Sequence, residues 1–197
     1  MSFSKEEVRS RVIECAIQYK GKLCNKELLF FYFDGEYKYI SVLFKKGHYK
    51  HLTGIETDLS ALDFYRGCVN KAISENQIAL KSNGTTFLKL QILDRIIDIA
   101  YNAKFLGDSI KTGVLLEIDK IVGNTFNGLG VGNSNDGTYH PKSVLNGDSR
   151  SRILKNHAIL AVYEKDIYSA DKGYTLVRKN TKLTDTGFEE ISKLIQK

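Results

Sequence analysis

The sequence is poor in the residues that build disulfide frameworks and structural metal sites. Its 197 residues include three cysteines, one methionine, one proline and no tryptophan. The cysteines, Cys15, Cys24 and Cys68, are odd in number and widely spaced, and no Cys-x-x-Cys pair occurs. This pattern argues against a zinc ribbon and a thioredoxin-type redox pair. We expect three reduced thiols in a cytosolic protein, two of them buried.

Long apolar runs are also missing. No stretch approaches the roughly 20 apolar residues that a membrane-spanning helix needs. The first ten residues are charged and contain no apolar segment of the kind found in signal peptides. We therefore expect no membrane association and a cytoplasmic location, either in the cell that makes the protein or in a host cell to which it is delivered.

Several well-known site motifs are absent as well. The sequence contains no His-Glu-x-x-His, no Gly-x-Ser-x-Gly, no zinc-spaced His/Cys cluster and no Asp-x-Asp pair for magnesium. If the protein cleaves phosphodiesters, we expect it to do so without a metal. The glycines match neither a dinucleotide-binding fingerprint nor a P-loop, so we interpret them as β-bulges and a long hairpin. They are Gly123, Gly128, Gly130, Gly132 and Gly137.

The composition is that of a globular protein with a positive balance of charge. Hydrophobic residues make up 42% of the chain and charged residues 26%, and the formal net charge is +6. A length of 197 residues suits one domain. The positive charge favours a polyanionic partner such as nucleic acid, although many basic proteins have no such partner.

Periodicity and turn residues predict helices and strands in separate blocks. Ser4-Lys5-Glu6-Glu7 forms a capping box, and apolar residues then recur at helical spacing to about Gly21. Asp34-Gly35 separates two β-prone runs, which predicts a hairpin. A second capping box, Thr186-Gly187-Phe188-Glu189, opens a C-terminal helix. The runs of the hairpin are 28–33 and 37–44, further helices are expected at 59–76 and 87–104, and further strands at 114–118, 121–122, 127–132, 158–163 and 174–178.

This order of elements predicts an α+β protein with helices packed on a small, mostly antiparallel sheet. We expect one domain, residues 1–197. Within it, residues 1–27 form an N-terminal helical extension, residues 28–180 the core, and residues 181–197 a C-terminal helix.

The richest candidate site follows the predicted strand 37–44. Residues 45–55 contain three lysines, His48, His51 and Thr53. In an extended segment, His51 and Thr53 would share a face. Imidazole titrates near neutral pH, and ammonium groups attract phosphates. The segment favours phosphodiester chemistry or anion binding. Alternatively, His51 closes a strand end before a Thr53-Gly54 turn, or the lysines protect a solvated edge strand.

Two later segments offer complementary groups. Around Pro141, which stiffens the chain, we expect a loop in which Lys142 and Ser143 present a cation and a hydroxyl to a phosphate. Arg150, Arg152 and Lys155 follow, and an ordinary basic surface loop is the alternative. Lys165 and Tyr168 end a predicted strand and would add a cation and a stacking ring to a nucleotide site. The alternative there is a strand end with a solvated lysine.

Together these segments resemble a family of phage-associated nucleases. The likeness rests on His-Leu-Thr-Gly-Ile at 51–55 and Pro-Lys-Ser-x-Leu at 141–145, with support from residues 39–42, residues 159–165 and Tyr168. The family groups with the barnase, EndoU, colicin and RelE-type RNases. The resemblance extends from about Leu28 to Tyr168, and both terminal helices lie outside it or decorate it.

The resemblance implies a barnase/RelE-like RNase fold with N- and C-terminal helical additions, and a sheet whose open face takes RNA. It implies RNA cleavage without metal or cofactor, in which the 2′-hydroxyl attacks phosphorus and a 2′,3′-cyclic phosphate results. His51 would be the acid or base, Thr53 and Ser143 would bind phosphate oxygens, and Lys142 and Lys165 would offset charge. The expected substrate contacts are Lys45, Lys46, Lys50, Tyr139, His140, Arg150, Arg152 and Tyr168.

A second hypothesis is a non-catalytic protein that uses the same basic face. It would be a phage-encoded inhibitor or nucleic-acid-binding protein, acting against a nucleic acid or a host defence complex. For the nuclease hypothesis we expect RNA as partner, and a cognate immunity protein is a further candidate. An active RNase should be toxic to its expression host unless it is neutralised, whereas an inhibitor should not be.

Overall fold

Nine strands form one sheet in the computed structural model, which describes residues 3–111, 113, 117–170 and 173–196. The strand order is β7-β3-β4-β5-β6-β2-β1-β8-β9, and every pair is antiparallel except β2 with β6. The predicted α+β class with a mostly antiparallel sheet is therefore confirmed. The strands are β1 (Lys26–Asp34), β2 (Glu36–Leu43), β3 (Phe105–Asp108), β4 (Lys120–Gly123), β5 (Asn127–Asn133), β6 (Tyr139–Asn146), β7 (His157–Ala158), β8 (Ala161–Asp166) and β9 (Thr175–Lys179).

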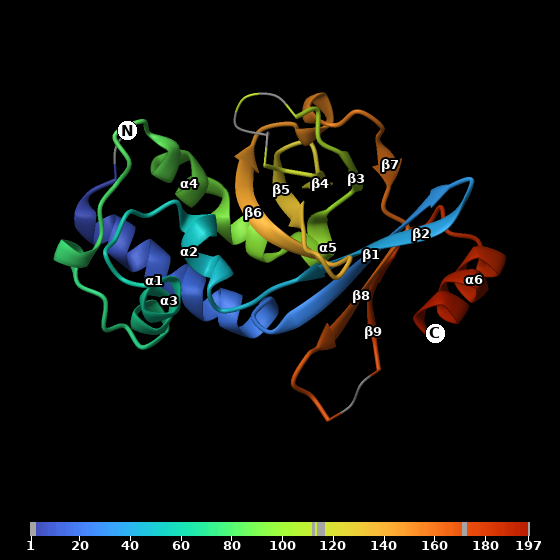
Figure 1. Cartoon of the computed structure of the whole chain (residues 1–197), viewed down its shortest axis with the longest axis horizontal. Helices are drawn as coiled ribbons and strands as arrows, with labels where there is room; N and C mark the ends of the chain where they lie inside the picture. The colour runs from blue at the N-terminus through green and yellow to red at the C-terminus, as the bar shows by residue number, and fades with distance from the viewer. Residues whose placement is uncertain (1–2, 112, 114–116, 171–172, 197) are drawn as a thin grey trace.

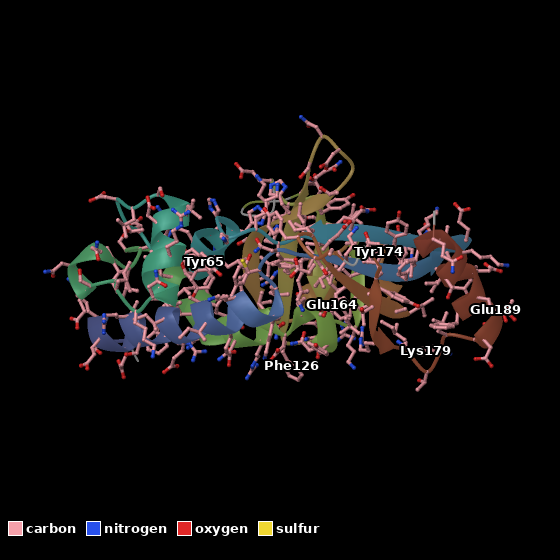
Figure 2. All side chains as sticks on the ribbon, turned by 90° about the horizontal axis from the view of Figure 1, so that it is seen from below. Tyr65, Phe126, Glu164, Tyr174, Lys179 and Glu189 are labelled. Atoms are coloured by element: carbon pink, nitrogen blue, oxygen red, sulfur yellow. The ribbon has the colours of Figure 1, made fainter. Side chains whose placement is uncertain are left out.

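The helices gather at the two ends of the molecule and along one face of the sheet. In Figure 1, α1 to α4 lie at one end and α6 at the other, and Figure 2 shows Tyr65 of α3 and Glu189 of α6 at opposite ends. The helices are α1 (Lys5–Lys22), α2 (His48–Thr53), α3 (Ala61–Val69), α4 (Thr85–Ile97), α5 (Ile99–Asn102) and α6 (Asp185–Ile195), with short 3-10 turns η1 (Glu75–Gln77) and η3 (Ser149–Arg152).

Alternation along β1 explains why both faces of the sheet are covered there. Leu28 and Phe30 belong to the main core, to which α1 to α5 contribute, whereas Leu29 and Phe31 belong to a smaller cluster with residues of α6. Successive strand residues point to opposite faces, so one apolar run serves two cores. The β1–β2 hairpin and the amphipathic first helix are confirmed, and the Ser4–Glu7 capping box is present in both directions.

The lysine- and histidine-rich segment is a helix, and the prediction of an extended conformation was wrong. His48–Thr53 forms α2, which ends at Gly54 with a left-handed φ of 69°. Two other helices are shorter than predicted. The helix expected at 59–76 begins after the cap Ser60 but ends at Val69, and the helix expected at 87–104 divides at Asp98 into α4 and α5.

The segment around Pro141 is strand β6, and the prediction of a stiff loop was wrong. The run expected at 158–163 divides into β7 and β8, while the strands expected at 121–122, 127–132 and 174–178 are present as β4, β5 and β9. The cap of α6 is Thr184, whose hydroxyl accepts from the Gly187 N–H, and not Thr186. Most of the strand expected at 114–118 lies outside the described residues.

The glycine-rich strand β5 forms a hairpin with β6, as predicted, and the pair contains one β-bulge. Gly130 pairs with Ser143 and Val131 pairs with Pro141, so Lys142 is the extra residue. The bulge therefore lies in β6. A bulge interrupts the ladder of hydrogen bonds and redirects side chains. The interruption accommodates Pro141 inside the sheet, and the side chain of Lys142 no longer follows the regular alternation of the strand.

Candidate functional site

A cavity of about 560 Å³ opens beside α2. Helix α2 lies beside α4 and β6 (Figure 1) and contacts both. The walls come from α2, from the loop that follows it, from α4 with the residues before it, and from the bulge of β6. The lining residues are Lys50, His51, Gly54, Ile55, Glu56, Thr57, Asp58, Lys81, Lys89 and Lys142.

Lys89 reaches the cavity from α4 by passing over the end of α2. Its ammonium group donates to the carbonyl oxygen of His51 at 3.0 Å. A Cβ atom at Gly54 would lie 2.9 Å from Cδ of Lys89, so the glycine leaves room for the stem of the lysine as well as forming the left-handed end of α2. Burial, with the nearby charge of Lys81, lowers the pKa of Lys89 to about 8.

Lys142 reaches the cavity from β6, and its side chain passes over β5. A Cβ atom at Gly132 would lie 2.7 Å from Cε and 3.0 Å from Cγ of Lys142. The absence of a side chain at Gly132 thus provides the path along which the lysine extends. Both Lys89 and Lys142 are therefore positioned by a glycine on a neighbouring element.

His51 lines the same cavity as these two lysines. Burial, and then the charges of Lys89, Lys142 and Lys50, lower the pKa of His51 below its ordinary value of 6.5. Two further histidines lie close by: after burial, the charge of His51 is among the causes that lower the pKa values of His48 and His140, and the rings of these two histidines are 5.8 Å apart. The Lys45 N–H donates to Nδ1 of His48, and the pKa of His48 is lowered to about 4 by burial and by the charges of His140 and Lys45. With a pKa of about 4, His48 is uncharged at neutral pH.

The cavity attracts anions because its cations are not neutralised. Among the described residues, Lys81, Lys89 and Lys142 form no ion pair with a carboxylate. Four lysines and His51 line the cavity, against the two carboxylates of Glu56 and Asp58. A bound phosphate would relieve the repulsion among the lysines and raise the pKa values of His51 and Lys89.

Thr53, Ser143 and Lys50 do not present their polar groups to the cavity as predicted. Thr53 is fully buried, and its hydroxyl donates to the Lys50 carbonyl and accepts from the Ile55 N–H. Helical residues two apart do not face each other, so α2 separates Thr53 from His51. Ser143 is half-buried beside Lys142 and does not line the cavity. Lys50 lines the cavity, but its ammonium group donates to two backbone carbonyls.

Lys165 and Tyr168 lie away from the cavity. Lys165 is on β8, which β2 and β1 separate from β6, so the two strands are about 14 Å apart. Its ammonium group pairs with Glu27 at 3.2 Å and lies over the ring of Tyr174, which Figure 2 labels. Tyr168 is 77% exposed in the turn after β8. The structure therefore does not bring these two residues to His51.

The remaining predicted contacts divide into two groups. Lys45 and His140 lie near the histidines of the site, because each of their charges acts on the pKa of His48. Arg150 pairs with Asp148 in η3, beyond the opposite end of β6. The same 3-10 turn contains Arg152, while Lys46 is exposed before α2 and Tyr139 is half-buried at the start of β6.

Four charged lining residues were missed in the sequence: Glu56, Asp58, Lys81 and Lys89. Lys89 carried a usable signal, because it interrupts the apolar stretch of a helix that is otherwise largely buried. Lysine is rarely placed against a core without a function or a partner. The other three lie in the segments that connect the helices, and the residues around them contain no comparable signal.

Within the described part of the chain, no group of three or more His, Cys, Asp or Glu side chains is arranged to hold a metal ion. All three cysteines are buried. In the same part of the chain, none of the helices combines the length and apolar character that crossing a membrane requires.

Comparison with known proteins gives one match. The model of a family described as phage-Barnase-EndoU-ColicinE5/D-RelE like nuclease 4 matches residues 11–182. The match begins within α1 and ends after β9, so it is longer than the range on which the resemblance was based. Neither the curated proteins nor the solved structures contain a significant match.

Proposed function

Because the chain belongs to the phage-Barnase-EndoU-ColicinE5/D-RelE like nuclease 4 family, we propose that the cavity beside α2 cleaves phosphodiester bonds in RNA. The name of the family describes a nuclease, and the choice of RNA, of mechanism and of residues is our proposal. The 2′-oxygen bonds to phosphorus, and the bond from phosphorus to the 5′-oxygen breaks. The products are a 2′,3′-cyclic phosphate and a 5′-hydroxyl.

The observation that carries this proposal is that His51 and Lys89 line one cavity, where the ammonium group of Lys89 donates to the backbone carbonyl of His51. A base and an acid that act together at neutral pH need pKa values on either side of 7. His51, whose pKa is lowered, is neutral there and accepts the proton of the 2′-hydroxyl. Lys89, with a pKa near 8, is mostly protonated and gives a proton to the departing 5′-oxygen.

The remaining lysines would stabilise the charge that develops on the phosphorane. Lys142 and Lys81 line the same cavity without carboxylate partners among the described residues. Such preorganised cations act most strongly where charge accumulates in the transition state. A divalent cation would be repelled from this group of lysines, which supports catalysis that does not depend on a metal.

The test is incubation of the purified protein with total RNA in EDTA, followed by mapping of the product ends. We expect cyclic phosphates and 5′-hydroxyls, and a loss of turnover in His51→Ala and Lys89→Met. His157→Ala and Lys20→Met are the matched controls, because His157 lies on β7 and Lys20 is exposed near the end of α1. Salt-sensitive RNA binding without any turnover would contradict the nuclease proposal and favour a non-catalytic role.

A further inference from the structure

A second cavity adjoins the lysine-lined one. Its volume is about 470 Å³, and Glu56, Thr57 and Asp58 line both cavities. One short segment of chain is therefore the wall between them. The other lining residues of the second cavity are Leu59, Asn76, Gln77, Ile78 and Ala79.

The shared wall is held rigidly on both sides. The backbones of Glu56 and Ala79 exchange two hydrogen bonds, of 3.0 and 2.9 Å. The ammonium group of Lys50 donates to the carbonyl oxygens of Thr57 at 3.0 Å and Leu59 at 2.7 Å. Lys50 is therefore a positioning residue that ties the wall to α2, next to His51. A wall fixed in this way is organised before a ligand arrives.

The chemistry of the second cavity differs from that of the first. Leu59, Ile78 and Ala79 provide apolar surface, while Glu56 and Asp58 provide carboxylates that form no ion pair among the described residues. An ionised carboxylate accepts hydrogen bonds and donates none. Beside a phosphate these two acids would be unfavourable, unless they bind N–H groups of the same ligand.

A nucleotide combines the two chemistries in one molecule, with a phosphate at one end and a flat base at the other. We propose that the second cavity binds the base next to the phosphate held by the lysines, and that Glu56 and Asp58 select bases with an exocyclic amino group. The amino group donates to the carboxylates, as in the known contact of Asp and Glu with cytosine N4. The faces of the base lie against the apolar wall. This inference rests on the proposed function, since it places the phosphate of the substrate in the first cavity.

Equilibrium binding tests this without requiring turnover. The probes are ribose 5-phosphate and the 3′- and 5′-monophosphates of guanosine, inosine, cytidine and uridine. Guanosine and inosine differ only by one amino group. In each pair we expect the amino-bearing nucleotide to bind on the order of 10-fold more tightly, the effect of a hydrogen bond to a charged group.

The double variant Glu56→Gln, Asp58→Asn should lose that preference and bind ribose 5-phosphate at least as tightly as before, because two negative charges are removed. Circular dichroism checks that the variant is folded. Glu189→Gln on α6 is the control that keeps the preference. Equal affinities within each pair, or a preference that survives in the double variant, would overturn the inference.

The outcomes also separate this inference from the proposed reaction. A protein that selects amino-bearing nucleotides but does not cleave RNA retains the base site and refutes the nuclease proposal. A protein that cleaves RNA but binds all the nucleotides alike retains the nuclease proposal and refutes the base site.

Discussion

Gly132→Ala tests whether Lys142 acts through the path that β5 leaves open. The new Cβ atom would lie 2.7 Å from Cε of Lys142, whereas an ordinary contact begins near 3.4 Å. The lysine stem must therefore move by about 0.7 Å, the difference between the two distances. Because a 1 Å displacement of a catalytic group can cost about 100-fold in rate, we expect kcat/KM for RNA to fall on the order of 10-fold.

The stability of the protein should change little. The backbone at Gly132 is not in the left-handed region, and the clashing atoms belong to a flexible side chain that can move aside. Alanine is favoured over glycine within a strand by about 0.5–1 kcal/mol, which offsets part of the crowding. Urea denaturation should therefore show a free energy of unfolding within about 1 kcal/mol of the wild type.

A double-mutant cycle decides the cause of the lost activity. The assay is initial-rate cleavage of a short labelled RNA in EDTA by wild type, Gly132→Ala, Lys142→Met and the double variant. If Gly132→Ala acts by displacing Lys142, it should have almost no further effect once Lys142 is methionine. An equal loss in both backgrounds, or no loss in either, would refute the reasoning that Lys142 extends across Gly132 to its site of action.

Four further changes have definite expected outcomes. In a pH–rate profile, RNA cleavage should speed up as His51 loses its proton and slow down above about pH 8 as Lys89 loses its own. Lys89→Arg should move the falling limb of the profile to higher pH. Gly54→Ala should lower the free energy of unfolding by about 1–2 kcal/mol, measured in urea, because Gly54 has a positive φ, and turnover should fall further because Lys89 is displaced. Lys50→Met should destabilise the protein by about 1–3 kcal/mol in the same assay, because two carbonyls lose a charged donor. Burial holds the pKa of His48 at about 4 while the unfolded chain takes up a proton near 6.5, so His48 alone should lower the stability by about 3 kcal/mol as pH drops from 6.5 to 4. In urea denaturation at the two pH values, His48→Gln should remove this part of the loss, and His51 and His140, whose pKa values are also lowered, should account for a further part.

Local patterns predicted those parts of the fold whose causes are local. The capping box at Ser4 and the Asp34-Gly35 turn act within a few residues, and both elements are present. The segment around His51 was wrongly predicted to be extended, because a short basic run after a strand has no strong periodicity of its own. Packing against α4 and β6 makes it a helix, and a change from strand to helix alters which side chains share a face.

The types of residue that line the site could partly be predicted from the sequence, but the individual residues that meet there could not. His51 and Lys142 were identified from residue type and motif, and both line the cavity. Lys165 had the same residue type and a plausible strand end, yet β2 and β1 separate its strand from β6, and it pairs with Glu27 on the adjacent strand β1. Lys89 was overlooked because its helix looked like core. Sequence patterns report which groups are available, whereas the order of strands in the sheet determines which of them meet.

By itself the sequence determined the supply of cations and imidazoles and the α+β class, because composition and periodicity follow directly from residue order. Only the tertiary structure decided that Lys89 and Lys142 converge on His51. Lys89 reaches the cavity over Gly54, and Lys142 reaches it over Gly132. Lys142 is also the extra residue of the bulge in β6. Such contacts join residues distant in the chain, and no local period encodes them.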